Sequence, residues 1–362
     1  MPYATINKPT QHFNTVTYTA DDTSPRTLTG FGHQPDFVWV KHRGSGSVSH
    51  TLVDRVRGGD KMLASNGMGA EDTKSHGEIT SWNADGITVA DGTNGTYPRL
   101  YFNDFDPFGA SVGGNYVAWS WKASNTTAVS NTAGTISSTV SVNPTAGFSI
   151  VSWTGNGTVG ATVGHGLGVA PSFFILKDRS NVRTWICYHK SIGNTGGINL
   201  NETGAASTSN AAFWNNTSPT SSVFSVSTYS NESSPNYITY CFAEVKGFSK
   251  FGSYTGNGSA DGTFVYTGFK PAFVLIKCSS AAENWHIFDD TRNTFNPTDK
   301  DLRPNLVNAE TTSSVSNIDF LSNGFKLRNS DADYNGSGRT YIYAAFAEQP
   351  LVGTNNVPAT AR

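Results

Sequence analysis

The stretch Pro35-Asp36-Phe37-Val38-Trp39-Val40-Lys41 decides the fold, because the chain contains three versions of it. It returns as Pro171-Ser172-Phe173-Phe174-Ile175-Leu176-Lys177 and as Pro271-Ala272-Phe273-Val274-Leu275-Ile276-Lys277. Each version has a proline, one variable residue, four apolar residues and a lysine. Four apolar residues in a row, largely β-branched or aromatic, are typical of a strand that is covered on both faces. Proline is tolerated at the first position of such a strand, so the sequence predicts three equivalent interior strands.

Other segments recur around these three strands. An alternating segment precedes each of them, and its aromatic residue (Tyr18, Trp153 or Tyr254) lies 17 or 18 residues before the motif proline. A segment with period-2 alternation closes each unit, at residues 116–121, 237–242 and 341–346. One face of these closing strands is predicted to be the core face, and the other carries mostly small or polar residues. The predicted core face consists of Val117, Trp119, Trp121, Ile238, Tyr240, Phe242, Ile342, Ala344 and Phe346.

The recurring segments divide the chain into three units of about 100 residues. Many short strands and Gly/Asn turns in units of this size predict antiparallel β-sandwiches. We therefore expect an all-β protein with three tandem antiparallel β-sandwich units. The Ser-, Thr- and Asn-rich linker is expected to carry at most one edge strand, near Ile136 to Val142. The predicted boundaries are an N-terminal arm at 1–12, units at 13–122, 147–248 and 249–349, a linker at 123–146 and a tail at 350–362.

Composition excludes several classes of protein. The formal net charge is −2 and there is no basic run, so a nucleic-acid partner is not expected. Residues 1–10 lack the apolar region of a secretory signal, and no stretch approaches the roughly 20 apolar residues of a membrane span. We therefore expect synthesis in a cytoplasm without a signal peptide, and no insertion into a membrane. Three scattered cysteines (Cys187, Cys241 and Cys278) are predicted to be small buried hydrophobic residues.

One stretch has the spacing of metal ligands. Asp331, Asp333 and Asn335 reproduce the first half of a calcium loop, but Ile342 stands where the bidentate glutamate belongs. A polar hairpin turn, in which Asp, Asn and Gly are wanted for backbone reasons, is the favoured interpretation. A calcium site remains the alternative, and no other cofactor is expected.

The sequence has no pattern that identifies a catalytic site. A nucleophile elbow, a metalloprotease helix motif and a phosphate loop are all missing. Glycan hydrolysis would need two carboxylates across a cleft, for which Asp289 with Asp290, or Asp104 with Asp106, are the candidates. The position of Asp289 is taken by His189 in the second unit, which favours a strand end without catalytic function. We predict that the protein is not an enzyme.

The first unit carries an aromatic insertion at residues 91–114. Ile87 and Tyr116 are 29 residues apart, whereas their counterparts Phe325 and Tyr341 are 16 apart. So many large apolar groups predict a contact with a partner protein, because aromatic residues concentrate at interface centres. The alternative is an Ω-loop folded over its own sandwich. The candidate interface residues are Tyr97, Tyr101, Phe102, Phe105 and Phe108.

Several long motifs carry a family resemblance. Residues 146–155, the turn Gly164-His165-Gly166-Leu167-Gly168, and residues 241–245 with 247–258 resemble an uncharacterised repeat family, a domain of unknown function common in tailed phages of marine bacteria. The resemblance extends from Asn7 to Glu348. It implies a virion-associated protein built of concanavalin-like or jelly-roll sandwiches, and it supplies no catalytic residues.

The resemblance, together with the missing catalytic motifs, predicts a non-enzymatic structural protein of the bacteriophage virion. A tail-fibre or capsid-surface appendage that contributes to assembly or host attachment is the leading interpretation. Its expected partners are other virion proteins, copies of itself, or host surface glycan. The alternatives are a carbohydrate-binding module that recognises host glycan, and a glycan-degrading enzyme. Head or tail location, copy number and receptor stay open at this point.

Overall fold

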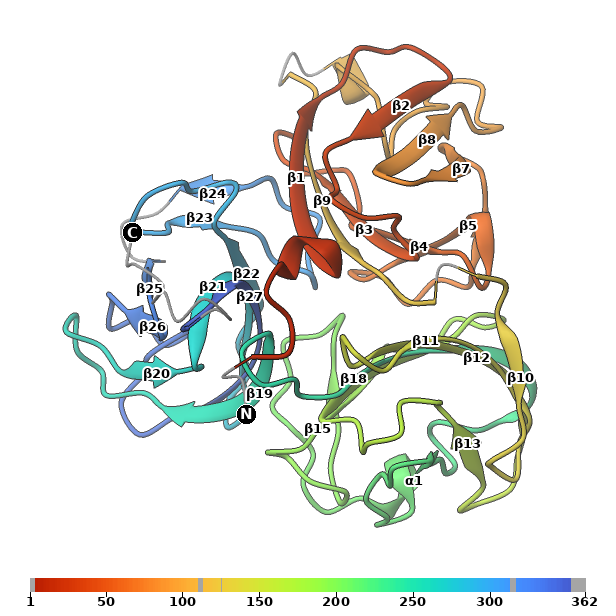
Figure 1. The fold of residues 1–362 in the computed structure, drawn as a ribbon, viewed down its shortest axis with the longest axis vertical. Helices are drawn as coiled ribbons and strands as arrows, with labels where there is room; N and C mark the ends of the chain where they lie inside the picture. The colour runs from red at the N-terminus through yellow and green to blue at the C-terminus, as the bar shows by residue number, and fades with distance from the viewer. Residues whose placement is uncertain (1–3, 110–112, 125, 313–316, 353–362) are drawn as a thin grey trace.

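The computed structural model describes residues 4–109, 113–124, 126–312 and 317–352. It is all-β, and its strands form three lobes around a common centre (Figure 1). We call β1 to β9 the first lobe, β10 to β18 the second lobe and β19 to β27 the third lobe. They run from red to orange, from yellow to green and from cyan to blue in Figure 1. Among the described helices, none is long and apolar enough to cross a membrane.

The first lobe pairs a large sheet with a small one. The described part of the large sheet follows the order β1 (Phe13–Thr19), β9 (Asn115–Trp121), β3 (Phe37–His42), β4 (Thr51–Asp54), β5 (Gly58–Ala64) and β6 (Asp72–Thr73). The small sheet has the order β2 (Arg26–Thr29), β8 (Gly86–Ala90) and β7 (Glu78–Asn83). Short 3-10 turns lie before β1 and β9, at η1 (Pro9–Gln11) and η2 (Pro107–Gly109).

The second lobe has the same plan with two added strands. Its large sheet follows the order β10 (Val129–Asn131), β11 (Ser138–Asn143), β12 (Phe148–Asn156), β18 (Ser233–Phe242), β14 (Phe173–Asp178), β15 (Ile186–His189) and β16 (Ile198–Asn199). The small sheet pairs β13 (Thr162–Gly164) with β17 (Val223–Ser225). The short helix α1 (Ala211–Trp214) is capped by the Asn210 side chain, which accepts a hydrogen bond from the backbone N–H of Ala212.

The third lobe repeats the plan once more. Its large sheet follows the order β19 (Ser249–Thr255), β27 (Thr340–Pro350), β21 (Phe269–Cys278) and β22 (Trp285–Asp289). Its small sheet has the order β20 (Phe264–Tyr266), β26 (Gly324–Leu327) and β25 (Ile318–Leu321), and β23 (Lys300–Asp301) pairs with β24 (Thr311–Thr312).

The three predicted motif strands, β3, β14 and β21, occupy the same place in their sheets. Each is an interior strand between the closing strand of its lobe and the strand that follows it. The register is also the same: Phe37 lies opposite Trp121 and Asp54, Phe173 opposite Phe242 and His189, and Phe273 opposite Phe346 and Asp289.

Both faces of each motif strand are buried, and they face different cores. Phe37 and Trp39 point into a cluster shared by all three lobes, whereas Val38 and Val40 point into the interior of the first lobe. The other two motif strands alternate in the same way. The sequence predicts a strand covered on both faces, and the structure confirms it. This double burial is the physical reason for four apolar residues in succession.

The shared cluster joins the lobes into one body. The ring centroids of Phe13 and Phe346, from the first and third lobes, are 5.0 Å apart. Those of Phe37 and Tyr240, from the first and second lobes, are 4.2 Å apart. Since burying one large apolar side chain contributes roughly 1.5–3 kcal/mol, a centre built from many of them resists separation of the lobes.

The structure adds to two expectations from the sequence. The nine residues predicted as the core face all lie in the shared centre, and the opposite face is buried as well, with Tyr116, Tyr237 and Tyr341 inside the individual lobes. The segment 123–146, predicted as a linker with an edge strand near Ile136 to Val142, carries that strand as β11 and also β10, and both extend the second sheet. Its serine and threonine residues are compatible with strand pairing at a solvated sheet edge, which composition alone did not distinguish from a linker.

Candidate functional site

The lysine that ends each motif is buried and reaches across a seam between lobes. Lys41 Nζ donates to the carbonyl oxygen of Val307 in the third lobe at 2.9 Å, and it also bonds the Val48 carbonyl of its own lobe at 2.6 Å. Burial lowers the pKa of Lys41 to about 7. Because the amine is buried away from solvent, the backbone carbonyls supply the hydrogen-bond acceptors that a buried polar group requires.

The other two motif lysines make the same bond and close a ring. Lys177 Nζ of the second lobe donates to Met68 O of the first lobe at 3.0 Å. Lys277 Nζ of the third lobe donates to Thr203 O of the second lobe at 3.1 Å. Burial lowers the pKa of both lysines to about 8. Each lobe therefore donates one lysine bond to one neighbouring lobe and accepts one lysine bond from the other.

Two indole bonds cross the same seams as Lys177 and Lys277. The indole Nε1 of Trp185, in the second lobe, donates to Ala64 O of the first lobe at 2.9 Å. The indole Nε1 of Trp285, in the third lobe, donates to Asn199 O of the second lobe at 2.9 Å. The first lobe has His50 at this position, and that residue is also buried.

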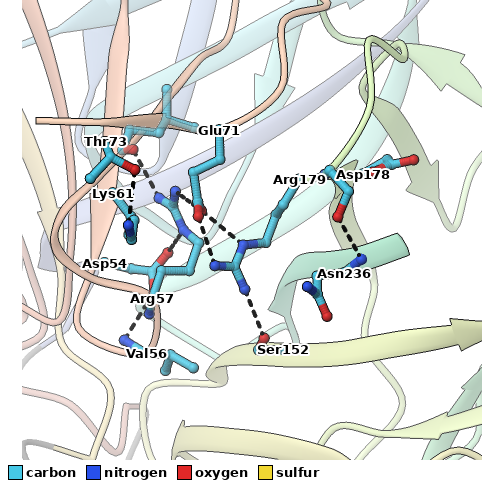
Figure 2. Close-up of polar contacts among 12 residues, drawn as sticks. Asp54, Val56, Arg57, Lys61, Glu71, Thr73, Ser152, Asp178, Arg179 and Asn236 are labelled. Atoms are coloured by element: carbon cyan, nitrogen blue, oxygen red, sulfur yellow. Dashed lines mark hydrogen bonds and ion pairs between the residues drawn. The ribbon is translucent and has the colours of Figure 1, made fainter. Parts of the chain in front are cut away.

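A buried ionic network crosses the seam between the first and second lobes. Figure 2 shows Glu71 between the guanidinium groups of Arg57, in its own lobe, and Arg179, in the second lobe. Its oxygens accept from Arg57 Nη1 at 3.1 Å and from Arg179 Nε and Nη2 at 2.8 Å each. Arg57 Nε also pairs with Asp54 Oδ2 at 2.5 Å. Burial would raise the pKa of Glu71, but the hydrogen bonds from Arg179 and the charge of Arg57 outweigh burial and lower it.

The seam between the first and third lobes has the same arrangement. Asp289 pairs with Arg292, whose Nη1 lies 3.1 Å from Glu310, and Glu310 is bound by Arg43 at 2.7 Å. Asp289 Oδ2 also accepts from Trp119 Nε1 of the first lobe at 3.0 Å.

At the seam between the second and third lobes, residues without a permanent charge occupy the positions of this ionic network. The residues that correspond to Asp54, Arg57, Glu71 and Arg179 are His189, Ile192, Ala206 and Ser279. The backbone bond survives, since Ala206 N–H donates to Ser279 O at 2.9 Å just as Glu71 N–H donates to Arg179 O. His189 Nε2 lies 3.2 Å from the Tyr343 carbonyl oxygen of the third lobe.

The structure places the three candidate calcium ligands in three different environments. Asn335 is fully buried, and its side chain accepts from Asn257 N–H at 3.0 Å and donates to Ser259 O at 2.9 Å. Asp331 Oδ1 accepts from Asp333 N–H at 2.8 Å. Asp333 is ion-paired with His286 at 3.1 Å. These contacts are those of a structured turn, and the described residues include no group of three acidic, histidine or cysteine side chains suited to a metal ion.

The Asn335 contact recurs in the other lobes. Asn231 accepts from Asn156 N–H at 2.9 Å and donates to Thr158 O at 2.9 Å. Asn103 accepts from Asp21 N–H at 3.2 Å and donates to Thr23 O at 2.8 Å. In each lobe a buried asparagine thus binds the loop that follows β1, β12 or β19. We call these three residues the clamp asparagines.

A buried histidine in the third lobe was not singled out from the sequence. His286 Nδ1 lies 3.0 Å from both Asp301 oxygens, and the Tyr334 hydroxyl lies 2.9 Å from the same nitrogen. Burial would lower the pKa of His286, but Asp301 and Asp333 outweigh burial and raise it. These residues come from separate segments, so no sequence spacing could have grouped them.

One carboxylate of each candidate pair accepts hydrogen bonds within the fold. Asp289 is fully buried and accepts from Arg292 and Trp119. Asp104 Oδ1 accepts from Asp106 N–H at 3.1 Å, as in a turn. Burial raises the pKa of Asp104.

The aromatic insertion divides into a buried part and an exposed part. Phe102 lies in the core of the first lobe, and half-buried Tyr101 packs against that core, as an Ω-loop requires. Phe105 and Phe108 are 46% and 43% exposed, and the ring centroids of Phe108 and Tyr97 are 4.6 Å apart. The predicted partner surface is therefore narrowed to Tyr97, Phe105 and Phe108, and the partner contact stays a prediction. Residues 110–112 of the predicted segment lie outside the described part of the chain.

These sheets and cores define an all-β protein with a β-sandwich-like fold. The chain belongs to the family described as Domain of unknown function (DUF7483), which matches residues 8–350. A comparison with curated proteins found no match.

Proposed function

We propose that this protein is a non-enzymatic structural component of a bacteriophage particle, a tail-fibre or capsid-surface appendage that contributes to assembly or host attachment. The observation that carries the proposal is the ring of seam contacts from Lys41, Lys177 and Lys277. Together with the shared aromatic centre, the ring makes three lobes into one rigid body. A rigid body of this kind suits a protein whose task is to hold a fixed shape.

The use of charged side chains supports a scaffold more than a catalyst. The buried carboxylates Asp54 and Asp289 are paired with arginines within hydrogen-bond distance. A catalytic carboxylate must reach its substrate, which these two groups cannot do while they hold the seams. Release of reducing ends from host polysaccharide that disappeared on substitution of Asp104 or Asp106 would count against the proposal.

In finer detail, we propose that the lobes are three tandem sandwiches of the jelly-roll or concanavalin-like type. The support is that each lobe combines a large sheet, a small sheet and its own hydrophobic core. Other virion proteins, or further copies of this chain, would contact half-buried Tyr97 and the exposed residues Phe105 and Phe108. The protein would be synthesised in the host cytoplasm and incorporated into the virion.

The decisive experiment is quantitative mass spectrometry of phage particles purified from infected host cells. The proposal predicts that the protein co-purifies with intact particles at a fixed ratio to the major capsid protein. Its presence in the infected-cell lysate, together with its absence from purified particles, would refute the proposal.

A carbohydrate-binding module that recognises host surface glycan is the second candidate. It is favoured by a cavity of about 410 Å³ where the first and second lobes meet, which Tyr229 lines together with polar side chains. Attachment to a host surface would give such a cavity a role within a structural protein.

A further inference from the structure

We propose that the cavity between the first and second lobes binds a neutral saccharide unit. The inference rests on the proposed role in host attachment, and it names the site and the ligand class. The cavity has a volume of about 410 Å³, within the range of roughly 300–1,000 Å³ that is usual for small-molecule sites. It opens beside β14 and β15 of the second lobe, and the Met68 loop of the first lobe forms part of its wall.

The walls offer an aromatic surface over an apolar floor. Leu176 and Ile186 are buried at the base, and Tyr229 lines the cavity with 62% of its surface exposed. The Tyr229 ring stacks on Phe213, with ring centroids 5.4 Å apart and planes at 22°. One face of the tyrosine is thereby supported, so the ring is held in place as a platform. A sugar ring has an apolar C–H face that can pack on such a platform, as apolar groups do on aromatic rings.

The rim carries side chains suited to hydroxyl groups. Arg183 and Glu232 form an ion pair there, and their side chains remain 56% and 38% exposed. The guanidinium presents several donors and the carboxylate two acceptor oxygens, so neighbouring hydroxyls of one sugar could be bound by both. Thr228 and Thr184 add further hydroxyls to the lining.

The charge of the lining indicates a neutral ligand. The one lining guanidinium, that of Arg183, is already paired with Glu232, and Asp178 is a second lining carboxylate. Asp178 accepts from the backbone N–H groups of Ser180 and Asn181 at 2.8 and 3.0 Å. An anionic ligand such as a phosphate or an acidic sugar would meet two carboxylates and no unpaired cation in this lining, whereas a neutral sugar needs only hydrogen bonds.

The third lobe shows that this cavity is not an unavoidable result of the fold. Ile186 and His286 occupy the same place, each opposite the fourth apolar residue of its motif strand. Tyr229 and Asp333 also correspond, since each lies two residues before a clamp asparagine. In the third lobe His286 and Asp333 form an ion pair at 3.1 Å. The second lobe instead has an apolar floor and an exposed aromatic ring at these two positions.

The first lobe is intermediate between these two cases. Its counterparts, Thr51 and Tyr101, line a cavity of about 160 Å³, which is too small for a sugar ring with its hydroxyls. The saccharide site is therefore specific to the second lobe.

The cavity is completed across the seam. The Met68 carbonyl of the first lobe accepts from Lys177 Nζ at 3.0 Å and from Arg183 N–H at 2.9 Å. These bonds fix the Met68 loop against the loop between β14 and β15 that carries Arg183. The motif lysine thus positions one wall of the proposed site as well as holding the lobes together.

The test is titration of the full chain with neutral sugars, followed by saturation-transfer NMR and calorimetry. The probes are glucose, galactose, mannose, N-acetylglucosamine and their β-linked disaccharides. Tyr229→Ala and Arg183→Ala are each expected to weaken binding about tenfold, which corresponds to about 1.4 kcal/mol. Phe295→Ala is the control, because Phe295 is 77% exposed in the third lobe and does not line the cavity.

The outcomes separate clearly. If none of these sugars binds the wild-type chain, or if both variants bind like the wild type, the inference is wrong. If Tyr229→Ala fails to fold, Arg183→Ala and the cavity-filling variant Thr228→Trp decide, since both positions are at the rim. Sugar binding that depends on these residues, in a protein missing from purified particles, would refute the virion proposal and leave the saccharide site standing. A protein that is present in purified particles but binds no sugar would refute the saccharide site and leave the virion proposal standing.

Discussion

Replacing Glu71 with alanine removes the group that joins two arginines across the seam between the first and second lobes. The change deletes three charge-assisted hydrogen bonds, one from Arg57 and two from Arg179. Arg57 keeps Asp54, the Leu52 carbonyl and the Tyr240 hydroxyl as partners, but its side chain has no exposed surface on which water could replace Glu71. Removing one partner of a buried pair typically costs about 3–5 kcal/mol. Because Glu71 retains 12% exposure, we expect a loss of about 3 kcal/mol, at the lower end of that range.

The assay is urea unfolding followed by tryptophan fluorescence, with the free energy of unfolding taken from the midpoint at constant m-value. Glu310→Ala breaks the equivalent network at the other charged seam and should cost a similar amount. Glu244→Ala is the matched control, because it breaks an ion pair with Lys190 in which the side chains are 42% and 34% exposed. Exposed pairs contribute about 0–1 kcal/mol, so its effect should be small. If Glu71→Ala costs no more than Glu244→Ala, the seam network does not hold the lobes together.

Four further predictions follow from the same contacts. Trp39→Ala should lower the free energy of unfolding by about 3–5 kcal/mol, because Trp39 is 2% exposed in the shared centre. A urea titration measures this loss. A loss below about 1 kcal/mol would contradict the packing of Trp39 in that centre. His286 has a raised pKa, so its stabilising charge is present below pH ~6.5 and is lost as pH rises through the folded-state pKa. Melting temperatures should therefore fall over that range in the wild type and less so in His286→Asn, and identical profiles would exclude the ionic role. Millimolar calcium should leave the melting temperature unchanged; an increase that Asp333→Ala abolishes would establish the calcium loop. Replacing Phe105 and Phe108 together by Ser should reduce self-association or particle incorporation without lowering the melting temperature. Size-exclusion chromatography and particle mass spectrometry measure these two effects. A lower melting temperature with unchanged assembly would mean that the two rings cover the first lobe's own core.

The sequence by itself determined the strand class and the place of the main strands. The side chains of residues 37–40 by themselves indicate a strand covered on both faces, since an apolar run and β-branched side chains are local properties of the sequence. The near-constant spacing from Tyr18 to Pro35, repeated in the other copies, aligned the motif strand and the alternating strand before it in all three lobes. Local reasoning failed where one pattern fits two environments. The polar segment with β10 and β11 was expected to be a linker with an edge strand at its end, and β10 was missed because Ser and Thr are compatible with a linker and with a sheet edge.

Only the tertiary structure decided how the lobes meet. Lys41 and the Val307 carbonyl are 266 residues apart, and a backbone acceptor leaves no trace in the sequence. The pairing of Glu71 with Arg179 likewise depends on the packing of two lobes, as does the cavity beside Tyr229. The physical reason is that hydrophobic periodicity says which face is buried but not against what. Hydrogen-bond partners and cavities are set by the surfaces that meet, and those surfaces exist only once the chain has folded.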